Sequence, residues 1–417
     1  MSARDLRRVL VLVPGALGER LSGPEIRAWE FARALSADYE VTLAARHGGG
    51  VRDGLPVVAA SRHVLLGEAA RHDAILSACL PPYLLALKLR LGFLAIADQY
   101  DPHELELATL DAGRSRERAL RSRFAIQALQ LRHADLVLCA AESQREQLVR
   151  TIHSLVRSGS PPRDPVVVPF GIPDPPAASA RRPLREHFAQ IADTDTLVLW
   201  WGSVWRWLDA ETPVRAFARM AASRPDIKLV ITAGRPPNKS AERFFDATDA
   251  ARSLAQELGV LGRTVLFYDQ WIPYEQRHDY LREADLGLTI HRDAAEARLA
   301  ARARYMDYLS ANLPCVLGRG DETAEEFGAA GFATLLDKPS PDDLAAALVA
   351  LADDPAALAT ARAAGAELAA GRRWSAVGAK LRAAVAAVSA MPASPTLLSD
   401  AGAYYARRVV DRVLAAG

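Results

Sequence analysis

The chain has 417 residues, and because a domain usually has about 100–200 residues, two domains are expected. Hydrophobic residues make up 50% and charged residues 24% of the chain, which excludes disordered, collagen-like and coiled-coil proteins. The formal net charge of +1 gives no chain-wide field for holding nucleic acid. We therefore expect a globular α/β protein whose charged contacts are local.

Short apolar runs alternate with amphipathic stretches of helical period in the first part of the chain, which predicts βαβ units and a mainly parallel sheet. The first run follows several arginines but is shorter than the apolar core of a signal peptide, so we interpret it as a buried strand. Predicted strands cover residues 8–14, 39–44, 74–77, 93–97, 135–139 and 166–169.

The alternation pauses at residues 158–163 and 173–182, where Pro, Ser, Ala and Asp dominate, and this predicts a domain boundary at about 173–194. After residue 340 the pattern is helical, with Pro355 opening one helix, a break at 391–395 and a last amphipathic helix at 399–416. Predicted strands of the second part cover residues 196–201, 228–233, 264–268, 286–291, 314–317 and 333–336.

The three cysteines lie far apart without C-x-x-C spacing, and each sits in or beside an apolar run. This predicts reduced core thiols and a cytoplasmic protein. No apolar stretch reaches the ~20 residues that span a bilayer, so we expect no transmembrane helix.

In parallel α/β sheets ligands bind beyond the carboxyl ends of the strands, and three loops there carry candidate chemistry. The first loop, residues 14–25, opens a helix with Ser22 and Glu25 at capping-box spacing, and its glycines, Gly23 among them, allow backbone N–H groups to approach a phosphate. A plain strand-to-helix turn is the alternative.

The second loop, residues 200–209, contains four of the seven tryptophans. Gly202 would let a ligand approach the backbone, and Trp205 and Trp207 could stack on a base or a sugar. The alternative is that these tryptophans fill the core.

The third segment runs from His291 to Pro314. In one continuous helix Arg298 and Arg302 would share a face that can bind a diphosphate, and the carboxylate of Asp307 could accept from ribose hydroxyls. A solvated, salt-bridged helix is the alternative.

These residues resemble the retaining nucleotide-sugar glycosyltransferases of family 4, in particular the subset with a Trp-rich loop in the donor domain. Residues 166–173 resemble the interdomain segment, and 201–209 stand where the family has a Gly-rich turn that binds the donor diphosphate. Residues 285–291 resemble the strand before the donor helix, and 307–316 match the stretch written E-A-M-A-x-G-x-P-V-V. By that match Asp307 takes the place of the Glu that holds the donor ribose.

The resemblance implies the GT-B fold, with two Rossmann-like domains facing each other across a cleft and a C-terminal helix that returns to the N-terminal domain. The acceptor-binding domain would cover residues 1–175 with the returning helix at 397–417, and the donor-binding domain residues 190–392. No metal and no cofactor are implied, because the nucleoside diphosphate sugar is a co-substrate.

The resemblance also implies three groups of site residues. The catalytic candidates are Asp101, Glu296 and Arg302; the donor-binding candidates are Gly23, Gly202, Ser203, Trp205, Arg206, Trp207, His291, Arg298, Arg304 and Asp307; the acceptor-side candidates are Asp98, Tyr100 and Glu142.

Two departures from the family pattern stand out. The usual phosphate-binding Arg and Lys positions fall on Ser203 and Leu208, and the spacing from Glu296 to Asp307 is 11 rather than the 8 of the usual Glu pair. Either the donor is handled differently or another cation supplies the missing charge. The candidates are Arg206, Arg298, Arg302 and Arg304.

The expected function is transfer of a sugar from a nucleoside diphosphate sugar to an acceptor hydroxyl with retention at the anomeric carbon, without a metal. The acceptor would be an envelope glycan, a lipid-linked sugar or a secondary metabolite of a bacterium. Two alternatives stay open: a nucleotide-sugar-binding partner protein without turnover, and a GT-B epimerase or coupling enzyme.

A basic helix predicted around residues 114–123 bears on location. Arginines there could contact an anionic bilayer, beside an apolar stripe of Leu120, Phe124 and Leu131. The favoured alternative is an ordinary surface helix whose stripe packs on the sheet. We expect a cytoplasmic protein, with peripheral attachment to the inner membrane face as the further option.

Overall fold

Two compact units make up the computed structural model of the chain. One unit comprises Met1–Pro169 and Trp374–Gly417, and the other comprises Phe170–Arg373. The structure describes residues 6–155, 164–176, 179–235, 244–292, 295–388, 390 and 396–416, and of residues 409–416 it describes the backbone. The pause predicted at 158–163 and the break predicted at 391–395 lie outside the described residues.

The first unit contains an eight-stranded sheet, and all of its strand pairs are parallel except β3 with β4. The strand order is β3-β4-β2-β1-β5-β6-β7-β8. The strands are β1 (Arg8–Leu12), β2 (Glu40–Ala45), β3 (Val51–Arg52), β4 (Leu55–Ala59), β5 (Ala74–Ser77), β6 (Leu94–Asp98), β7 (Leu136–Cys139) and β8 (Val166–Val167). The helices are α1 (Gly23–Leu35), α2 (Arg62–Ala69), α3 (Pro82–Leu91), α4 (His103–Ala108), α5 (Arg114–His133), α6 (Glu142–Leu155), α16 (Trp374–Ala387) and α17 (Leu397–Ala416).

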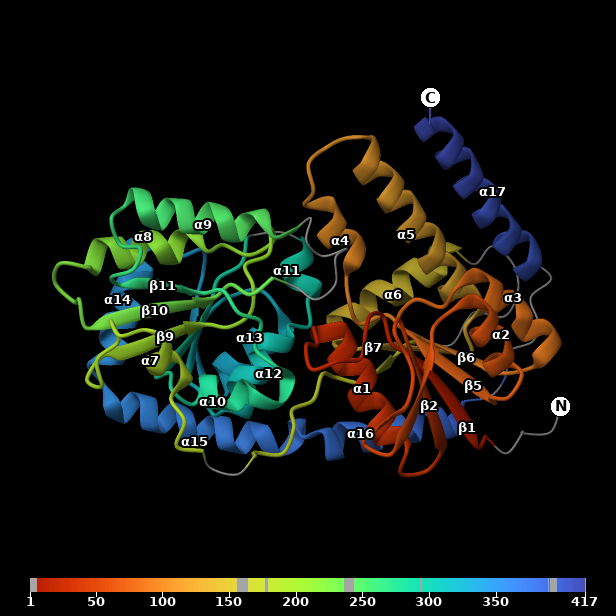
Figure 1. Cartoon of the computed structure of the whole chain (residues 1–417), viewed down its shortest axis with the longest axis horizontal. Coiled ribbons are helices and arrows are strands. Elements are labelled where there is room, and N and C mark those ends of the chain that lie inside the picture. The colour runs from red at the N-terminus through yellow and green to blue at the C-terminus, as the bar shows by residue number, and fades with distance from the viewer. Residues whose placement is uncertain are drawn as a thin grey trace. The chain divides into compact units, whose positions relative to one another are not determined.

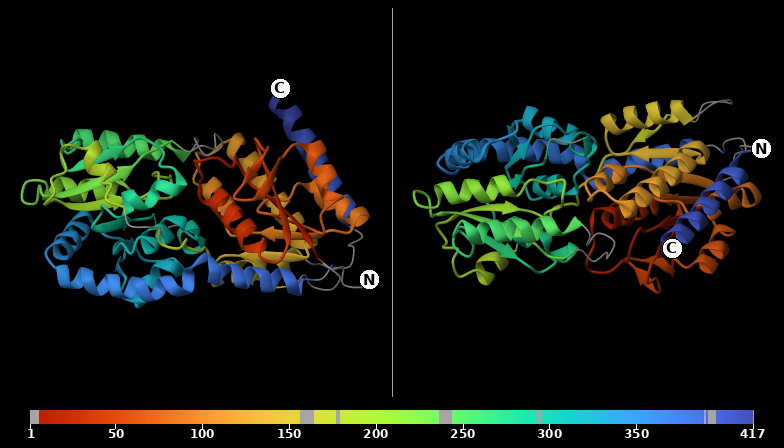
Figure 2. Two further views of the ribbon diagram at one scale, coloured as in Figure 1. Left: turned by 60° about the horizontal axis from the view of Figure 1, so that its bottom comes forward. Right: turned by 90° about the horizontal axis from the view of Figure 1, so that it is seen from above.

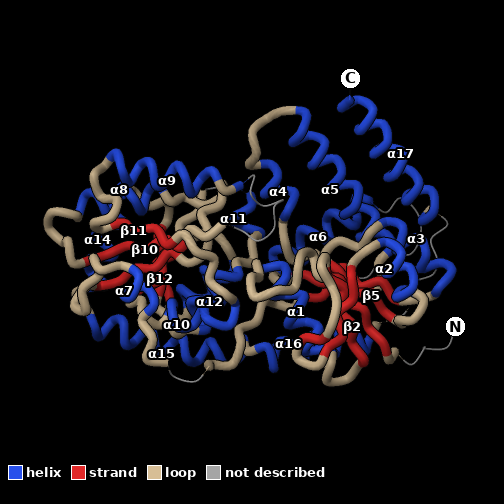
Figure 3. Tube along the Cα trace, in the orientation of Figure 1, coloured by secondary structure: helices blue, strands red, loops and turns tan. Residues whose placement is uncertain are grey.

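Alternating side chains of β1 pack on the two faces of this sheet, because successive residues of a strand point to opposite sides. Leu10 and Leu12 join one core cluster with residues of α2, α3, α5 and α17. Val9 and Val11 are buried on the other side, where α1 packs on β1 and β2. Figure 3 shows the strands of each sheet surrounded by helices.

The second unit contains a six-stranded parallel sheet with the order β11-β10-β9-β12-β13-β14. Its strands are β9 (Thr196–Trp200), β10 (Ile227–Thr232), β11 (Val265–Tyr268), β12 (Leu286–Thr289), β13 (Cys315–Gly318) and β14 (Ala333–Leu336). Its helices are α7 (Pro183–His187), α8 (Glu211–Met220), α9 (Asp246–Glu257), η2 (Tyr274–Gln276), α10 (Arg277–Leu281), α11 (Ala295–Leu299), α12 (Ala303–Ser310), α13 (Glu322–Ala329), α14 (Pro341–Ala352) and α15 (Pro355–Arg372).

All twelve predicted strands are present, each within one or two residues of its expected ends. The sequence interpretation missed β3 and β4, whose segment is broken by Asp53 and Gly54, both with positive φ. Pro355 opens α15, as predicted.

The C-terminal helices pack on the first unit. α17 contacts α5 and α3, as the two further views in Figure 2 also show, which agrees with the predicted returning helix. α16 packs on α1, with Phe31 and Trp374 edge to face at 6.2 Å between ring centroids. The second unit therefore ends at Arg373 rather than at the expected residue 392.

Two of the three cysteines lie in the core. Cys139 and Cys315 are buried free thiols as expected, but Cys79 is exposed, because it follows β5 in a loop rather than lying in the strand.

No single helix among the described residues is long and apolar enough to cross a membrane. Only α14 and α15 together reach that length and composition, with a 91° bend between them. α14 packs on α8 and α15 on α12, so both helices belong to the packing of the second unit.

Candidate functional site

Two loops meet at the carboxyl ends of the second unit's central strands. The β9–α8 loop pairs with the chain that follows β12 through an antiparallel bridge between Leu208 and His291. Asp209 N–H donates to the Ile290 carbonyl at 2.9 Å, and Arg292 N–H donates to the Trp207 carbonyl at 3.1 Å. The Trp-rich loop and the third candidate segment therefore lie side by side at the edge of the sheet where a parallel topology predicts ligand binding.

The β9–α8 turn depends on Gly202, whose φ of +79° lies in the region that favours glycine. Its N–H donates to Thr232 Oγ1 at 2.6 Å, and the hydroxyl of Ser203 donates to the Gly234 carbonyl at 2.8 Å. The turn is thus fixed by its neighbour β10. Ser203 and Leu208, which stand at the positions of the usual phosphate-binding cations, are both uncharged and buried.

Tyr308 on α12 ties the strands beneath the turn together. Its hydroxyl accepts from Trp201 N–H at 3.1 Å and lies 2.9 Å from the Leu288 carbonyl, to which it donates. The ring fits because Gly287 has no side chain, since a Cβ there would lie 2.9 Å from it. Burial raises the pKa of Tyr308 to about 12, so its hydroxyl stays protonated.

Asp307, the predicted ribose ligand, is buried with both carboxylate oxygens engaged. Oδ2 accepts from Trp201 Nε1 at 2.9 Å, and Oδ1 lies 3.0 Å from Arg277 Nη1. Burial raises the pKa of the Asp307 carboxyl, although Arg277 and the Trp201 hydrogen bond oppose that shift. A ribose hydroxyl would share this carboxylate with partners that are already in place.

The two predicted stacking tryptophans stack on each other. The rings of Trp205 and Trp207 are 5.7 Å apart with an interplanar angle of 13°, and Trp207 also meets Phe244 edge to face. Trp207 is buried, whereas Trp205 is partly exposed. Trp205 thus has the more accessible ring for a base or sugar, and Trp207 supports it.

The helix predicted through residues 298–305 is broken in the structure. α11 ends at Leu299 and α12 begins at Ala303, with extended backbone at Arg302 (φ −79°, ψ 109°). Arg302 is buried, and its Nη2 donates to Glu296 Oε2 at 3.0 Å. Arg298 and Arg302 therefore do not share one helical face, because the buried ion pair overrides the helical propensity of this alanine-rich stretch.

Arg302 and Glu296, two of the catalytic candidates, form a buried ion pair with each other, so their charges offset one another. Although burial alone would lower the pKa of Arg302, the charge of Glu296 raises it. Asp321, which caps α13 by accepting from Ala324 N–H at 2.8 Å, lies 3.9 Å from Arg302 Nε and 4.0 Å from His291 Nε2. Burial raises the pKa of Asp321 to about 6, against the charge of Arg302. This cluster connects the ends of β12 and β13 with α11.

Three further donor-binding candidates lie apart from this cluster. Arg206 donates through Nε to Asp246 Oδ1 at 2.8 Å, and Arg298 is exposed on α11. Gly23 opens α1 in the first unit, where Ser22 and Glu25 form the predicted capping box. The carboxylate of Glu25 occupies the Ser22 N–H, so it competes with any anion at that helix start.

The acceptor-side candidates have structural partners in the first unit. Arg27 is fully buried and donates to both oxygens of Asp98, at 2.7 and 2.9 Å. It also donates to the Val168 and Pro169 carbonyls and lies 4.8 Å from the ring centroid of Tyr100. The Arg27–Asp98 pair thus anchors the end of β6 to the segment after β8. Glu142 is exposed and bonds to Arg145 on its own helix.

Asp101, the remaining catalytic candidate, lies partly exposed between β6 and α4. Ligand atoms of Asp101, His103 and Glu106 come within 4.8 Å of one another, which is close enough to hold a metal ion. His103 Nδ1 lies 3.1 Å from Glu106 Oε2, so these two side chains also bond to each other.

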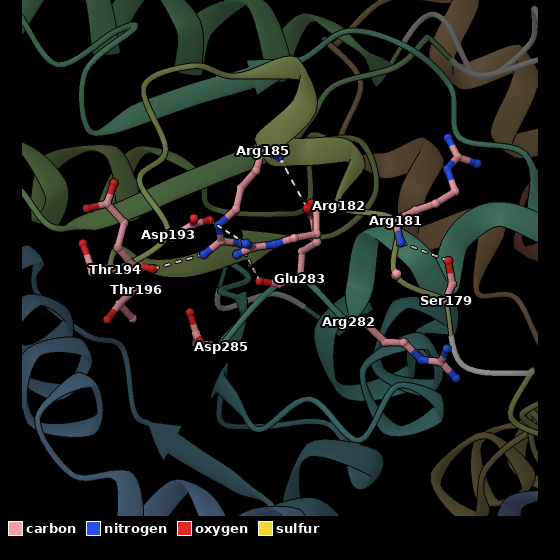
Figure 4. A pocket seen from close by; sticks show the side chains of 12 residues that line it. Ser179, Arg181, Arg182, Arg185, Asp193, Thr194, Thr196, Arg282, Glu283 and Asp285 are labelled. Atoms are coloured by element: carbon pink, nitrogen blue, oxygen red, sulfur yellow. Dashed lines mark hydrogen bonds and ion pairs between the residues drawn. The ribbon is translucent and has the colours of Figure 1, made fainter.

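A polar cavity of about 530 Å³ lies elsewhere on the second unit (Figure 4). It is lined by residues at the amino ends of the central strands, Thr196 at the start of β9 and Asp285 just before β12, so it lies at the opposite end of the sheet from the Trp-rich loop. Arg185 donates to the Glu283 and Asp195 carbonyls, and Arg182 pairs with Asp193. These charges stabilise the start of the second unit and do not form the predicted donor site.

Sequence reasoning missed the residues that bond to Asp307 and fix its orientation. Arg277 lies on α10, 30 residues before Asp307, and no spacing rule connects the two. Trp201 was counted as part of the Trp-rich loop, but its bond to Asp307 was not foreseen. Only Gly287, a glycine inside a strand, signals the close approach of Tyr308.

Known structures resemble about nine tenths of the chain. Anabaena HepE, solved in complex with UDP and glucose, has a TM-score of 0.68 at 13% identity, covering 92% of this chain and 100% of that chain. Sucrose-phosphate synthase from Thermosynechococcus elongatus has a TM-score of 0.66 at 17% identity, covering 90% and 97%. WaaG, a glycosyltransferase involved in lipopolysaccharide biosynthesis, has a TM-score of 0.61 at 16% identity, covering 90% and 98%.

No family model matches the chain, and no curated protein matches it in sequence. The structural matches nevertheless cover 100% and 97% of the first two matched chains, and this chain itself has two units, each built on a mainly parallel sheet. The chain therefore has the GT-B fold, the fold of nucleotide-sugar glycosyltransferases, as the sequence resemblance implied.

Proposed function

We propose that this protein is a glycosyltransferase that moves a sugar from a nucleoside diphosphate sugar to an acceptor hydroxyl, with retention of the anomeric configuration and without a metal. The observation that carries the proposal is the joining of the β9–α8 and β12–α11 loops at the carboxyl ends of the second unit's strands. A parallel α/β sheet binds nucleotides at that edge. HepE, with the same fold, has been solved with UDP-glucose.

The proposed donor site uses the turn at Gly202 for the diphosphate, Trp205 for stacking and Asp307 for the ribose. In such a transfer, negative charge develops on the leaving diphosphate while the sugar becomes oxocarbenium-like. Preorganised positive charge and positioning can supply the catalysis, with no metal required. Arg302 and Glu296 contribute by tying α11 to the start of α12, and Asp101 is the proposed catalytic group of the acceptor-binding unit.

The acceptor belongs to the first unit in this proposal, as an envelope glycan, a lipid-linked sugar or a secondary metabolite of a bacterium. We propose a cytoplasmic location for this transfer. Contact with the inner membrane face would involve α5, where Arg114 and Arg121 are exposed and Phe124 is 52% exposed. Leu131 of the same helix is buried, so only part of the expected stripe packs inside.

A nucleotide-sugar-binding partner protein without turnover is the second candidate function. The specific observation in its favour is that Ser203 and Leu208, which replace the usual phosphate-binding cations, are buried and uncharged. A third candidate is a GT-B epimerase or coupling enzyme.

One assay separates the three candidates. Purified protein is mixed with UDP-, GDP-, ADP- and dTDP-sugars, with and without acceptors of each class, and released nucleoside diphosphate is measured. We expect acceptor-dependent release and a glycoside with the donor's anomeric configuration. Binding without release under any acceptor supports the partner protein, release without a glycoside supports the third candidate, and an inverted product contradicts retention.

A further inference from the structure

The candidate donor turn has uncharged residues at the two positions where phosphate-binding cations are expected, and the arginine in the same loop, Arg206, is paired with Asp246. Ser203 and Leu208 are uncharged, and Ser203 has its hydroxyl bonded to the Gly234 carbonyl. The start of α8 does not replace them, because Asp209 already caps it by accepting from Glu211 N–H and Thr212 N–H, both at 3.1 Å. An anion placed at that helix start would face a carboxylate.

Arg304 brings a positive charge to the same turn from another element. It lies on α12, and its Nη2 donates to the Ser203 carbonyl at 2.9 Å. The guanidinium carbon lies 5.7 Å from the ring centroid of Trp200, at the end of β9. A Cβ built on Gly202 would lie 3.5 Å from Nη2 of Arg304, so the guanidinium and the glycine turn are in direct contact.

Arg304 also has a spare donor. Its Nη1 is buried, and among the residues that the structure describes none accepts a hydrogen bond from it. An unsatisfied buried donor costs stability, more so when it is charged, and such a group is an observation that needs a partner. Burial lowers the pKa of Arg304 to about 10, which is still far above neutrality, so the side chain remains a cation.

The other three candidate cations either form ion pairs with carboxylates or lie on a different helix from the one that contacts the Gly202 turn. Arg302 is paired with Glu296 at 3.0 Å in a buried contact. Arg206 is paired with Asp246. Arg298 is exposed on α11, a separate helix from the one that contacts the turn. Arg304 is the nominated cation that touches the glycine turn itself.

We propose that Arg304 is the residue that binds the diphosphate of the donor, supplying from α12 the charge that is missing at Ser203 and Leu208. This inference rests on the proposed function and names its phosphate ligand. The diphosphate would lie over Gly202 and Ser203, away from the capped start of α8. Its oxygens would accept from the guanidinium in the charge-assisted geometry that arginine favours.

The test is the affinity of the purified full chain for UDP, GDP, ADP and dTDP, measured by titration calorimetry for wild type, Arg304→Gln and Arg304→Lys. The matching nucleosides are measured by ligand-observed NMR as probes without phosphate. Arg224→Gln is the matched control, because it removes the same charge from an arginine paired with Asp226 and Asp353 before β10.

We expect Arg304→Gln to weaken binding of the nucleoside diphosphate at least about tenfold and to leave nucleoside binding unchanged. The affinity of Arg304→Lys for the nucleoside diphosphate should lie between those of wild type and Arg304→Gln. The affinity of Arg224→Gln should match that of wild type. The slope of affinity against salt should fall in Arg304→Gln, because one charge fewer contacts the ligand. Retained nucleoside binding shows that the variant site is folded.

Two failures are distinguishable. If wild type binds a nucleoside diphosphate and Arg304→Gln binds it equally well, the assignment of Arg304 is overturned while the proposed function stands. If wild type binds none of the four nucleoside diphosphates, the proposed function itself is overturned, and this inference with it.

Discussion

Asp307 has structural partners and is also the proposed ribose ligand. Its two oxygens hold Trp201 and Arg277, yet each carboxylate oxygen has a second lone pair that a ribose hydroxyl can use. A residue with such partners is preorganised, since its orientation is fixed before the ligand arrives. Because of these bonds, a loss of ligand affinity on mutation of Asp307 could come from a lost ligand contact or from disturbed packing around Trp201 and Arg277.

A ribose-specific readout resolves the ambiguity. Asp307→Asn should weaken binding of the nucleoside diphosphate by ~1–3 kcal/mol, because a charge-assisted hydrogen bond is lost. It should also reduce the preference for the ribonucleotide over its 2′-deoxy analogue, measured by calorimetry with both ligands. Arg277→Gln is the control, because it breaks the same ion pair and leaves the carboxylate. A preference that survives in Asp307→Asn, or that Arg277→Gln abolishes equally, would remove Asp307 from direct ribose contact.

At the scale of single residues the sequence could nominate site candidates but could not predict their partners. Gly202, Trp205 and Asp307 could be nominated because a strand end, a glycine and a family motif coincide at them. The commitments of Arg302 to Glu296 and of Arg27 to Asp98 could not be predicted, since each pair joins residues whose contact depends on the tertiary fold. Charged residues at matching spacing look alike in a sequence whether they bind a ligand or each other.

Among the elements, the division between α11 and α12 changes the site most. A continuous helix would have placed Arg298 and Arg302 on one outer face. The break instead buries Arg302 beside Glu296, and the helix that starts at Ala303 presents Arg304 to the Gly202 turn. Alanine-rich sequence favours helix at every position here, so propensity alone gives no sign of the interruption.

The last helix was predictable because its apolar positions recur at helical spacing. Its first turn offers a sharp test, since Leu397 is 2% exposed in the core of the first unit and Leu398 is 64% exposed. His133 Nε2 lies 2.9 Å from Asp400 Oδ2, which supports the same docking.

Leu397→Ala should lower the free energy of unfolding by ~2–5 kcal/mol, the cost of emptying a buried leucine site. Leu398→Ala should change it by less than about 0.5 kcal/mol, since a surface substitution removes no packing. Chemical denaturation followed by circular dichroism measures both. Equal effects of the two substitutions would show that α17 does not pack on α3 and α5 as described.

At the scale of the molecule, the fold was the part that sequence predicted most completely. Twelve alternating apolar runs specify two parallel sheets, and the crossover rules leave few topologies for them. The extent of each unit was less predictable: α16 packs on α1 through Phe31 and Trp374, and an alanine-rich helix carries little signal about its partner. Substrate specificity was not predictable, because it depends on a few side chains on a widely used fold.

The central claim is that the second unit binds a nucleoside diphosphate sugar at the Gly202 turn, and a crystal structure with the donor identified by the release assay tests it most directly. The account predicts the diphosphate within hydrogen-bond distance of Arg304, the ribose at Asp307 and the base or sugar against Trp205. A donor bound in the cavity beside Thr196 and Asp285, or anywhere else away from the carboxyl ends of β9 and β12, would contradict it.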